Sequence, residues 1–353
     1  MDKQKYLLFG DAAYPHIYKW YKELNKQFDV HVVTFANQEK IGFEYENLIC
    51  ISREVNAKGS NIALLFSLFR VFKLIRLIKP KYVNAHYATS YGFIAAIISC
   101  FLKFKLIIST WGTDILVTPY KNVAYKTITR FTLNKANIVT SDSDFMSNHI
   151  AKLSRKSVDQ ILTFPMGIEK NEIPKEVVNK SKKTFLSLRT LNENSNVDII
   201  IQAFSIMTKE CPDVELVIAH KGSEEAKLKE LSKGLNIRFV GFLNREELIQ
   251  IMSEAKFYLS IPTSDSISVS LIETMAYGCI PILSNIAANR EVINNSNGLI
   301  SELKVNDLVL VMKEAYEMLD KDSDKIRMIN YELIKNKYVW ENNIKKYIDE
   351  VKI

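Results

Sequence analysis

In the segment Phe257-Tyr-Leu-Ser-Ile-Pro-Thr-Ser-Asp-Ser-Ile-Ser-Val-Ser-Leu-Ile-Glu-Thr-Met-Ala-Tyr-Gly-Cys-Ile-Pro-Ile-Leu-Ser284, two apolar runs flank a helical pattern. The run Lys256–Ile261 predicts a buried strand, and the turn residues after it lead into a helix over Ser268–Tyr277. Gly278 is the expected C-cap, because glycine readily adopts the left-handed conformation that ends helices. The run Ile280–Ser284 predicts a second strand. Strand, helix and strand in this order indicate parallel strands joined by a helical crossover.

The same alternation extends over the whole chain and predicts an α/β fold. The chain has 353 residues, of which 47% are hydrophobic, and this is enough for two cores of ordinary domain size. The other predicted strands are Tyr6–Phe9, Val30–Phe35, Tyr82–His86, Leu106–Ser109, Ile138–Ser141, Thr184–Leu188, Leu216–His220 and Ile237–Phe239. The residues near Pro165-Met-Gly-Ile168 and the polar run Lys180-Ser-Lys-Lys183 indicate the connection between the two domains.

Two carboxylates, Asp265 and Glu273, stand eight residues apart across the start of the predicted helix. The free N–H groups and the dipole at a helix start favour a diphosphate. Asp265, on the loop, is within reach of a sugar hydroxyl, and Glu273 can accept two hydrogen bonds from a ribose diol. The spacing therefore suggests a sugar-nucleotide site. The alternative is that Asp265 only caps the helix and Glu273 is a solvated helical residue.

Five ordered pieces between Phe185 and Leu303 resemble the nucleotide-binding half of a family 4 retaining glycosyltransferase of the GT-B fold. The pieces are Ser187-Leu-Arg-Thr-Leu191 with Asn196–Phe204, Leu216–Glu225, Ile237–Leu243, the acidic pair, and Arg290–Leu299. The family has Glu-x7-Glu where this chain has Asp265-x7-Glu273, one methylene shorter at the first position. Glycines common in the family near the first acid are replaced by Ser266 and Ser268.

The resemblance implies two Rossmann-like parallel-sheet domains that face each other across a cleft, where catalysis takes place. The expected domains are an acceptor-binding domain over residues 1–168, a nucleotide-sugar-binding domain over 169–335, and a C-terminal helix over 336–353 that crosses back to the first domain. Arg189 and the helix start at Ser266, Ser268, Val269 and Ser270 would hold the diphosphate. Glu273 would bind the ribose and Asp265 the donor sugar.

One expected cation is missing from this pattern. The family usually pairs the arginine with a lysine some six residues later, and Ser195 stands at that position. A leaving diphosphate gains negative charge, so preorganised cations stabilise the transition state more than the ground state. Lys221, at the end of the neighbouring strand, is the candidate substitute.

The first half carries a fainter version of the family pattern. Gly10 and His16 belong to the loop and helix start after the first strand, where these enzymes face the acceptor. His86 ends a strand and resembles the histidine that contacts the donor sugar, which makes it a catalytic candidate together with Asp265 and Glu273. Trp111 and Asp114 lie in a segment that resembles the family's Trp-Gly-Ser-Asp, so they are candidate acceptor-binding residues. The alternatives are a structural histidine at His86 and a helix cap or ion-pair partner at Asp114.

Positive charge is concentrated in the first half. Residues 1–170 carry a net charge of +10, and the rest carry −3. Residues 55–141 contain twelve Lys and Arg and a single acid, and the predicted helix Ile62–Ile78 is apolar with three cations interspersed. This pattern is typical of a surface that meets anionic lipid, and the alternative is a core helix with a basic edge. No nucleic-acid partner is expected, because no stacking motif accompanies the charge.

The remaining features indicate a cytoplasmic protein, with peripheral binding at the inner membrane face as an option. Neither a signal peptide nor a membrane-spanning run is recognisable, and the scattered Cys50, Cys100, Cys211 and Cys279 are expected to be reduced thiols. Asp142-Ser-Asp144 has the form that another transferase fold uses for a divalent metal, but helix capping explains it more simply. No metal or other cofactor is therefore expected.

The resulting hypothesis is a retaining glycosyltransferase of the hexosyltransferase type. It would move a sugar from a nucleotide diphosphate donor, UDP-linked by preference, to a hydroxyl of a lipid-linked or cell-surface glycan such as a capsule or O-antigen polysaccharide. Two alternatives remain open. One is a GT-B-type nucleotide-sugar epimerase, and the other is a non-catalytic accessory subunit of a transferase complex.

Overall fold

The structure, a computed structural model, describes residues 3–51, 61–178, 180 and 183–352, with the backbone alone for 61–66. The chain forms two compact units. The first comprises the chain up to Phe164 with the segment from Ile344 onward, and the second comprises Pro165–Asn343. Two stretches singled out in the sequence lie partly outside the described residues, namely the polar run 180–183 and the start of the basic stretch 55–141.

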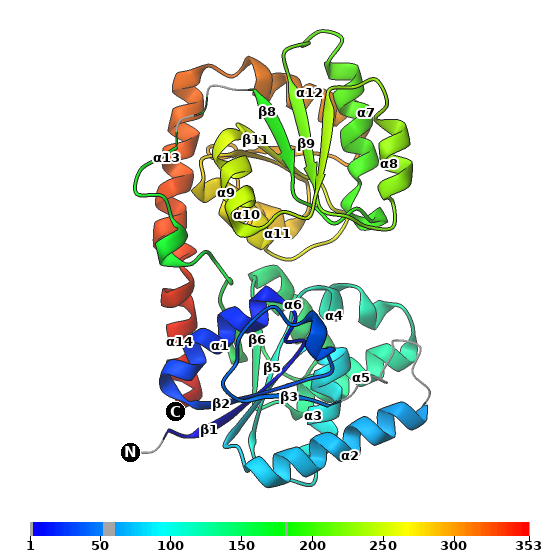
Figure 1. Ribbon diagram of the computed structural model, residues 1–353, viewed down its shortest axis with the longest axis vertical. Helices are drawn as coiled ribbons and strands as arrows, with labels where there is room; N and C mark the ends of the chain where they lie inside the picture. The colour runs from blue at the N-terminus through cyan, green and yellow to red at the C-terminus, as the bar shows by residue number, and fades with distance from the viewer. Residues whose placement is uncertain (1–2, 52–60, 179, 181–182, 353) are drawn as a thin grey trace. The chain divides into compact units, whose positions relative to one another are not determined.

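The first unit is built on a seven-stranded sheet with the order β3-β2-β1-β4-β5-β6-β7 (Figure 1). Every neighbouring pair of strands in it is parallel. Because both faces of such a sheet are covered, its central strands are continuous apolar runs. The strands are β1 Lys5–Phe9, β2 Asp29–Thr34, β3 Leu48–Cys50, β4 Tyr82–His86, β5 Lys105–Ser109, β6 Ile138–Ser141 and β7 Ile161–Thr163.

Helices cover the two faces of this sheet. One face packs against α2, α3, α5 and α6, whose inward side chains join one core with β1, β4, β5 and β6. On the other face, the Trp20 ring of α1 lies 4.8 Å from the Tyr347 ring of α14, and the Tyr347 hydroxyl bonds to that of Tyr6 on β1. The helices are α1 Pro15–Gln27, α2 Asn61–Ile78, α3 Gly92–Ile98, α4 Thr113–Leu116, α5 Val123–Lys135, α6 Asp144–Leu153 and α14 Trp340–Lys352.

The second unit repeats this architecture with six parallel strands in the order β10-β9-β8-β11-β12-β13. Helices α7, α8 and α12 pack on one face, and α9, α10 and α13 on the other (Figure 1). The elements are β8 Thr184–Ser187, α7 Val197–Met207, β9 Glu215–Ala219, α8 Glu225–Leu231, β10 Ile237–Gly241, α9 Arg245–Glu254, β11 Phe257–Ser260, α10 Val269–Ala276, β12 Ile280–Ser284, α11 Ala287–Arg290, β13 Leu299–Ser301, α12 Val305–Glu317 and α13 Asp320–Lys337.

The segment Phe257–Ser284 folds as predicted. Strands β11 and β12 pair in parallel, and α10 connects them. Ser268 is the N-cap of α10 and Tyr277 is its C-cap, so glycine takes the position after the cap. Gly278 has a φ of +77°, and a Cβ atom there would come within 2.7 Å of the Val178 carbonyl oxygen. A side chain at this turn would be strained and would also collide with the backbone.

Three strands of the described part of the chain were not predicted. They are β3, β7 and β13, each of three residues, and each lies at an edge of its sheet. All six residues of β3 and β13 except Ser301 are only partly buried. Such short, half-covered strands lack the long apolar run that marks a central strand.

Candidate functional site

Arg189 and Asp265 form an ion pair at the carboxyl ends of β8 and β11, which are neighbours in the second sheet. The Arg189 Nη1 atom lies 2.6 Å from Asp265 Oδ2, and the side chains are 15% and 28% exposed. Burial opposes the guanidinium charge, but the Asp265 carboxylate outweighs it and raises the pKa of Arg189. Ligands bind open parallel sheets at this edge. The pair therefore places a permanent cation beside the first predicted acid.

Glu273 projects from α10 into a second ion pair. Arg245 Nη1 lies 2.7 Å from Glu273 Oε1, and Arg245 also pairs with Glu172 at 2.8 Å. Arg245 is the first residue of α9, whose N-cap Asn244 forms a capping box with Glu247. One arginine thus holds two carboxylates, and the Glu273 side chain, only 15% exposed, is held in place on the helix.

The start of α10 carries the predicted serines. The Ser268 side chain makes no capping hydrogen bond to the helix. It lies instead 2.9 Å from Ser270 Oγ, which in turn lies 2.8 Å from the Tyr258 hydroxyl. Ser266 donates its backbone N–H to Asp265 Oδ1 at 3.0 Å, and Val269 is the first helical residue. A helix start without a side-chain cap can bind an anion.

Ser195, at the position where the family usually has a lysine, does not expose its hydroxyl group to a ligand. It is 1% exposed, and its hydroxyl donates to the Thr190 carbonyl oxygen at 2.6 Å. Its neighbours connect two loops: Asn194 Nδ2 donates to the Ser264 carbonyl oxygen at 2.9 Å, and Asn196 Nδ2 donates to that of Ile261 at 2.8 Å. The segment 194–196, which has Ser195 in place of a lysine, is therefore hydrogen-bonded to the loop that carries Asp265.

Lys221 and His220 follow β9, the strand beside β8. Burial, and then the charge of Arg189, lowers the pKa of His220, so this imidazole is neutral at pH 7. Lys221 is exposed. Lys221 is thus an exposed cation at this sheet edge, as the substitute-cation hypothesis requires, and its contact with a diphosphate stays a prediction.

Sequence reasoning missed Arg245, Glu172, Asn194 and Asn196. The contacts of the first two join residues far apart in the chain, which periodicity does not reveal. One signal was available for Arg245, because Asn244-x-x-Glu247 is a capping box directly after a parallel strand. The residue after such a cap lies at the edge where ligands bind.

The predicted residues of the first unit form one cluster at the carboxyl ends of β1, β4 and β5. The Trp111 indole N–H donates to His86 Nδ1 at 3.0 Å, and the His16 and Trp111 rings lie 4.2 Å apart. A Cβ atom at Gly10 would come within 2.6 Å of Ile17 Cδ1 and 3.4 Å of His86 Cβ. The absence of a side chain at Gly10 therefore permits the close approach of Ile17 and His86.

His86 is fully buried in this cluster, with an exposed fraction of 0%. Because the indole donates to Nδ1, the proton of the neutral imidazole is on Nε2. That atom, like Nε2 of His16, is buried and has no hydrogen-bond partner among the residues that the structure describes. The predicted contact of His86 with a donor sugar is therefore not prepared in the free protein and stays a prediction.

Asp114 is buried, with 2% exposure, and its carboxylate serves the backbone. Oδ2 accepts from the Ala88 N–H at 2.7 Å, and Oδ1 accepts from the Trp111 N–H at 2.9 Å. Burial raises the pKa of Asp114 to about 6, against the lowering effect of these bonds. Asp114 is the second residue of α4, whose N-cap is Gly112, so it is not the helix cap of the alternative; its carboxylate positions the backbone of Trp111 and Ala88, and its contact with an acceptor stays a prediction.

The histidines of this cluster predict an acid-sensitive first unit. Burial lowers the pKa of His16 to about 4, and burial followed by the neighbouring His16 lowers that of His86 well below 6.5. As the pH falls, both histidines are protonated in the unfolded chain at a higher pH than in the native protein. Their contribution to the unfolding free energy is therefore fully present above about pH 6.5 and is lost as the pH falls toward 4. Asp114 acts in the opposite direction between about pH 4 and 6, because its native pKa is raised.

For His16 alone, the expected loss between pH 7 and pH 5 is about 2 kcal/mol of unfolding free energy. The His16→Gln variant should lose about that much less than the wild type over the same interval. Urea denaturation followed by tryptophan fluorescence measures it, because Trp20 and Trp111 both belong to this unit. His149→Gln, which removes an imidazole outside the cluster, is the control. Equal losses in the wild type and His16→Gln would contradict the burial of a neutral His16.

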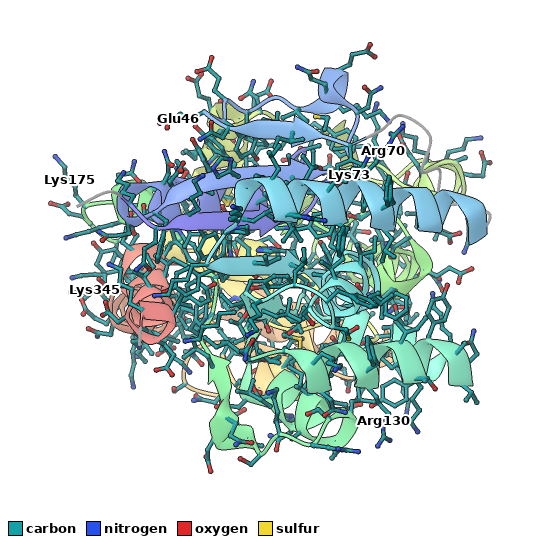
Figure 2. All side chains as sticks on the ribbon, turned by 90° about the horizontal axis from the view of Figure 1, so that it is seen from below. Glu46, Arg70, Lys73, Arg130, Lys175 and Lys345 are labelled. Atoms are coloured by element: carbon teal, nitrogen blue, oxygen red, sulfur yellow. The ribbon has the colours of Figure 1, made fainter. Side chains whose placement is uncertain are left out.

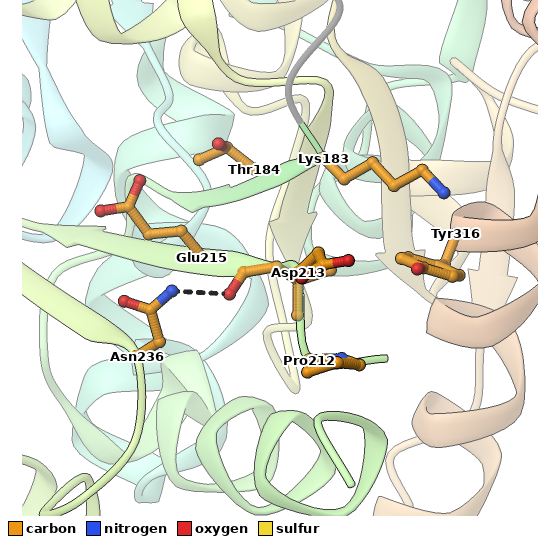
Figure 3. Close-up of a pocket in the computed structure, with 8 residues that line it drawn as sticks. Lys183, Thr184, Pro212, Asp213, Glu215, Asn236 and Tyr316 are labelled. Carbon is orange, nitrogen blue, oxygen red and sulfur yellow. Dashed lines mark hydrogen bonds between the residues drawn. The ribbon is translucent and has the colours of Figure 1, made fainter. Parts of the chain in front are cut away.

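A hollow of about 640 Å³ in the second unit lies at the other edge of its sheet (Figure 3). Thr184 and Glu215, the first residues of β8 and β9, line it, and Asn236 donates to the Val214 carbonyl oxygen at 2.8 Å. Lys183 Nζ lies 3.6 Å from the Tyr316 ring centroid. Because it opens at the amino ends of the strands, this hollow is separate from the predicted site.

The segment Asp142-Ser-Asp144 lies at the start of α6. Ser143 is the N-cap of α6, and its side chain accepts from the Met146 N–H, so Asp142-Ser-Asp144 begins a helix as predicted. The described residues contain no group of three or more His, Cys, Asp or Glu placed to hold a metal ion. All four cysteines are free thiols. None of the helices in the described ranges combines the length and the hydrophobicity that crossing a bilayer requires.

Comparison with known proteins assigns both halves of the chain. Residues 5–143 match the glycosyl transferase 4-like family, and residues 169–330 match the glycosyl transferases group 1 family. Over its whole length, the fold is similar to that of the Anabaena protein HepE in complex with UDP and glucose, with a TM-score of 0.81, 14% identity and 99% of each chain covered. At this identity the likeness shows the fold, which is GT-B.

Two curated relatives match part of the chain. An uncharacterized glycosyltransferase of Haemophilus influenzae is 27% identical over 45% of this chain and 47% of its own. The alpha-monoglucosyldiacylglycerol synthase of Streptococcus pneumoniae is 28% identical over 40% of this chain and 35% of its own. The matched region thus spans less than half the length of either relative.

Proposed function

Since this chain belongs to the group 1 and 4-like glycosyltransferases of the GT-B fold, we propose that it transfers a hexose from a UDP-sugar to a hydroxyl of a lipid-linked or cell-surface glycan acceptor. The observation that carries this proposal is the pair of ion pairs at one sheet edge, Arg189 with Asp265 and Arg245 with Glu273. They provide a cation for a diphosphate and a carboxylate for a ribose.

In the proposed reaction, Arg189 and the start of α10 bind the diphosphate, Glu273 accepts from the ribose hydroxyls, and Asp265 accepts from the donor sugar. The bond between the anomeric carbon and the phosphate oxygen breaks as the acceptor oxygen bonds to the same face of the sugar. The leaving phosphate takes the acceptor's hydroxyl proton. The configuration is thereby retained, and UDP is the second product.

The choice of UDP rests on the fold neighbour that binds UDP and glucose. The choice of acceptor rests on the name of the pneumococcal relative, which refers to a diacylglycerol lipid. No metal takes part in the proposed reaction, since the positive charge comes from Arg189 and Lys221. These cations stabilise the leaving phosphate oxygen, which gains negative charge in the transition state.

The test is a transfer assay with radiolabelled UDP-sugars and bacterial lipid extract, run with and without EDTA. We expect label in the lipid or glycan fraction and the release of one UDP for each sugar transferred. An α-linked donor should give an α-linked product, and EDTA should leave the rate unchanged. Label that stays in an isomerised free nucleotide sugar would instead identify an epimerase. Nucleotide binding without turnover would identify an accessory subunit, and activity lost in EDTA and restored by manganese would overturn metal independence.

A further inference from the structure

The outer side of α2 combines positive charge with large apolar side chains. Phe69 and Leu77 are 55% and 78% exposed, and Arg70, Lys73 and Arg76 are exposed between them. Successive helical residues are about 100° apart, so these five side chains fall on one side of the helix. The opposite side is buried in the core through Val71, Ile75 and Ile78. We call the five exposed residues the basic face of α2.

No exposed carboxylate lies within the segment 61–141, which contains this face. From residue 61 to residue 141 the sequence has eleven Lys and Arg and a single acid, Asp114. Asp114 is 2% exposed and is bound to the backbone, so it does not neutralise the surface. Ordinary protein surfaces intersperse both signs of charge. The exposed charged side chains that this segment contributes to the surface are therefore all cations.

The neighbouring helices also expose apolar and basic side chains. In the core, α3 packs between α2 and α5, and Figure 2 looks onto these helices with Arg70, Lys73 and Arg130 labelled. Phe101, in the turn after α3, is 74% exposed, and Val123, at the start of α5, is 80% exposed. Lys73 Nζ lies 4.5 Å from the Phe69 ring centroid, so cation and aromatic ring share one site.

We propose that the basic face of α2 docks on an anionic lipid surface and brings the acceptor-binding half of the enzyme to its lipid-linked acceptor. This inference deepens the proposed function and rests on its lipid-linked acceptor. Cations attract the phosphates of anionic headgroups, and exposed Phe and Leu side chains gain free energy on entering the boundary between headgroups and acyl chains. A nucleic acid would use the cations but would leave Leu77 in water, so lipid accounts for more of the surface.

The test is flotation of the full-length protein with vesicles at about 0.15 M salt. The wild type should float with phosphatidylglycerol-containing vesicles and not with pure phosphatidylcholine. Lys73→Glu with Arg76→Glu should lower the bound fraction at least about tenfold, and Phe69→Ser with Leu77→Ser should lower it severalfold. Arg70 is left unchanged because it donates to the Ile51 carbonyl oxygen at 2.8 Å.

The matched control is Lys321→Glu with Lys325→Glu, the same charge change at exposed residues of α13, which should float like the wild type. Two results would overturn the inference. One is flotation unaffected by reversal of Lys73 and Arg76. The other is binding that polyuridylate abolishes while the Phe69 and Leu77 variant floats normally, which indicates a polyanion site.

UDP titration of every variant separates this inference from the proposed function. Retained UDP affinity, together with an unchanged urea unfolding curve by tryptophan fluorescence, in a variant that no longer floats shows that both units are folded and that only the lipid contact is lost. Flotation of a wild-type protein that neither binds UDP nor transfers sugar would instead contradict the proposed function and leave the lipid contact standing.

Discussion

Replacing Arg189 with alanine is expected to lower kcat/KM for sugar transfer by about 100- to 1000-fold. The diphosphate gains negative charge as the glycosidic bond breaks. The position where the family usually has a second cation, a lysine, is occupied here by the neutral Ser195. Ser195 is buried and donates to the Thr190 carbonyl oxygen. Arg189, only 15% exposed and held by Asp265 at 2.6 Å, is therefore a preorganised cation at this edge.

Two measurements separate the charge effect from a general disturbance. The affinities for UDP and UMP differ by one phosphate, so the Arg189→Ala variant should lose most of the wild type's preference for UDP. Arg189→Lys should recover part of it, since it keeps the charge without the planar fork. The control is Arg238→Ala, at an exposed arginine of β10 paired with Glu215. An unchanged preference for UDP in Arg189→Ala would show that the diphosphate binds elsewhere.

Replacing Glu273 with alanine is expected to weaken UDP binding by about 10- to 100-fold, because hydrogen bonds to a charged group contribute about 1.5–3 kcal/mol each. Arg245 holds this carboxylate at 2.7 Å and binds Glu172 at the same time. Such an anchored acceptor is suited to a ribose diol. Arg245→Ala should give a smaller loss, since it frees Glu273 without removing it.

The diagnostic reagent for Glu273 is 2′-deoxy-UDP, which lacks one of the two hydroxyls. The wild type should prefer UDP to the deoxy analogue, and Glu273→Ala should bind both with nearly equal affinity. Glu314→Ala, at an exposed residue of α12, is the control and should keep the preference. If Glu273→Ala discriminated as well as the wild type, Glu273 would not be the ribose ligand.

The central strands and the end of α10 were predictable because they carry local signals. An apolar run marks β11, and glycine marks the end of α10, where φ at Gly278 is +77°. The edge strands β3, β7 and β13 were not predictable in the same way, since each has three residues. Their pairing is decided by the neighbouring strand, which a pattern of apolar residues does not contain.

The parts of the site that the sequence did not reveal depend on contacts across the chain. Arg245 binds Glu172 and Glu273, and Asn194 binds the backbone of Ser264. In the first unit, the pattern located His86 at a strand end but not its complete burial under the ring of Trp111. Burial and partner choice follow from tertiary packing, and only motif spacing is visible in one dimension.

Calorimetric titration of the purified protein with UDP, GDP and ADP tests the nucleotide-diphosphate site most directly. We expect saturable binding of one nucleotide, UDP, at a single site, weakened in both Arg189→Ala and Glu273→Ala and unchanged in Arg238→Ala. Binding of none of the three, or binding that both substitutions leave intact, would contradict a donor site at the carboxyl ends of β8, β9 and β11.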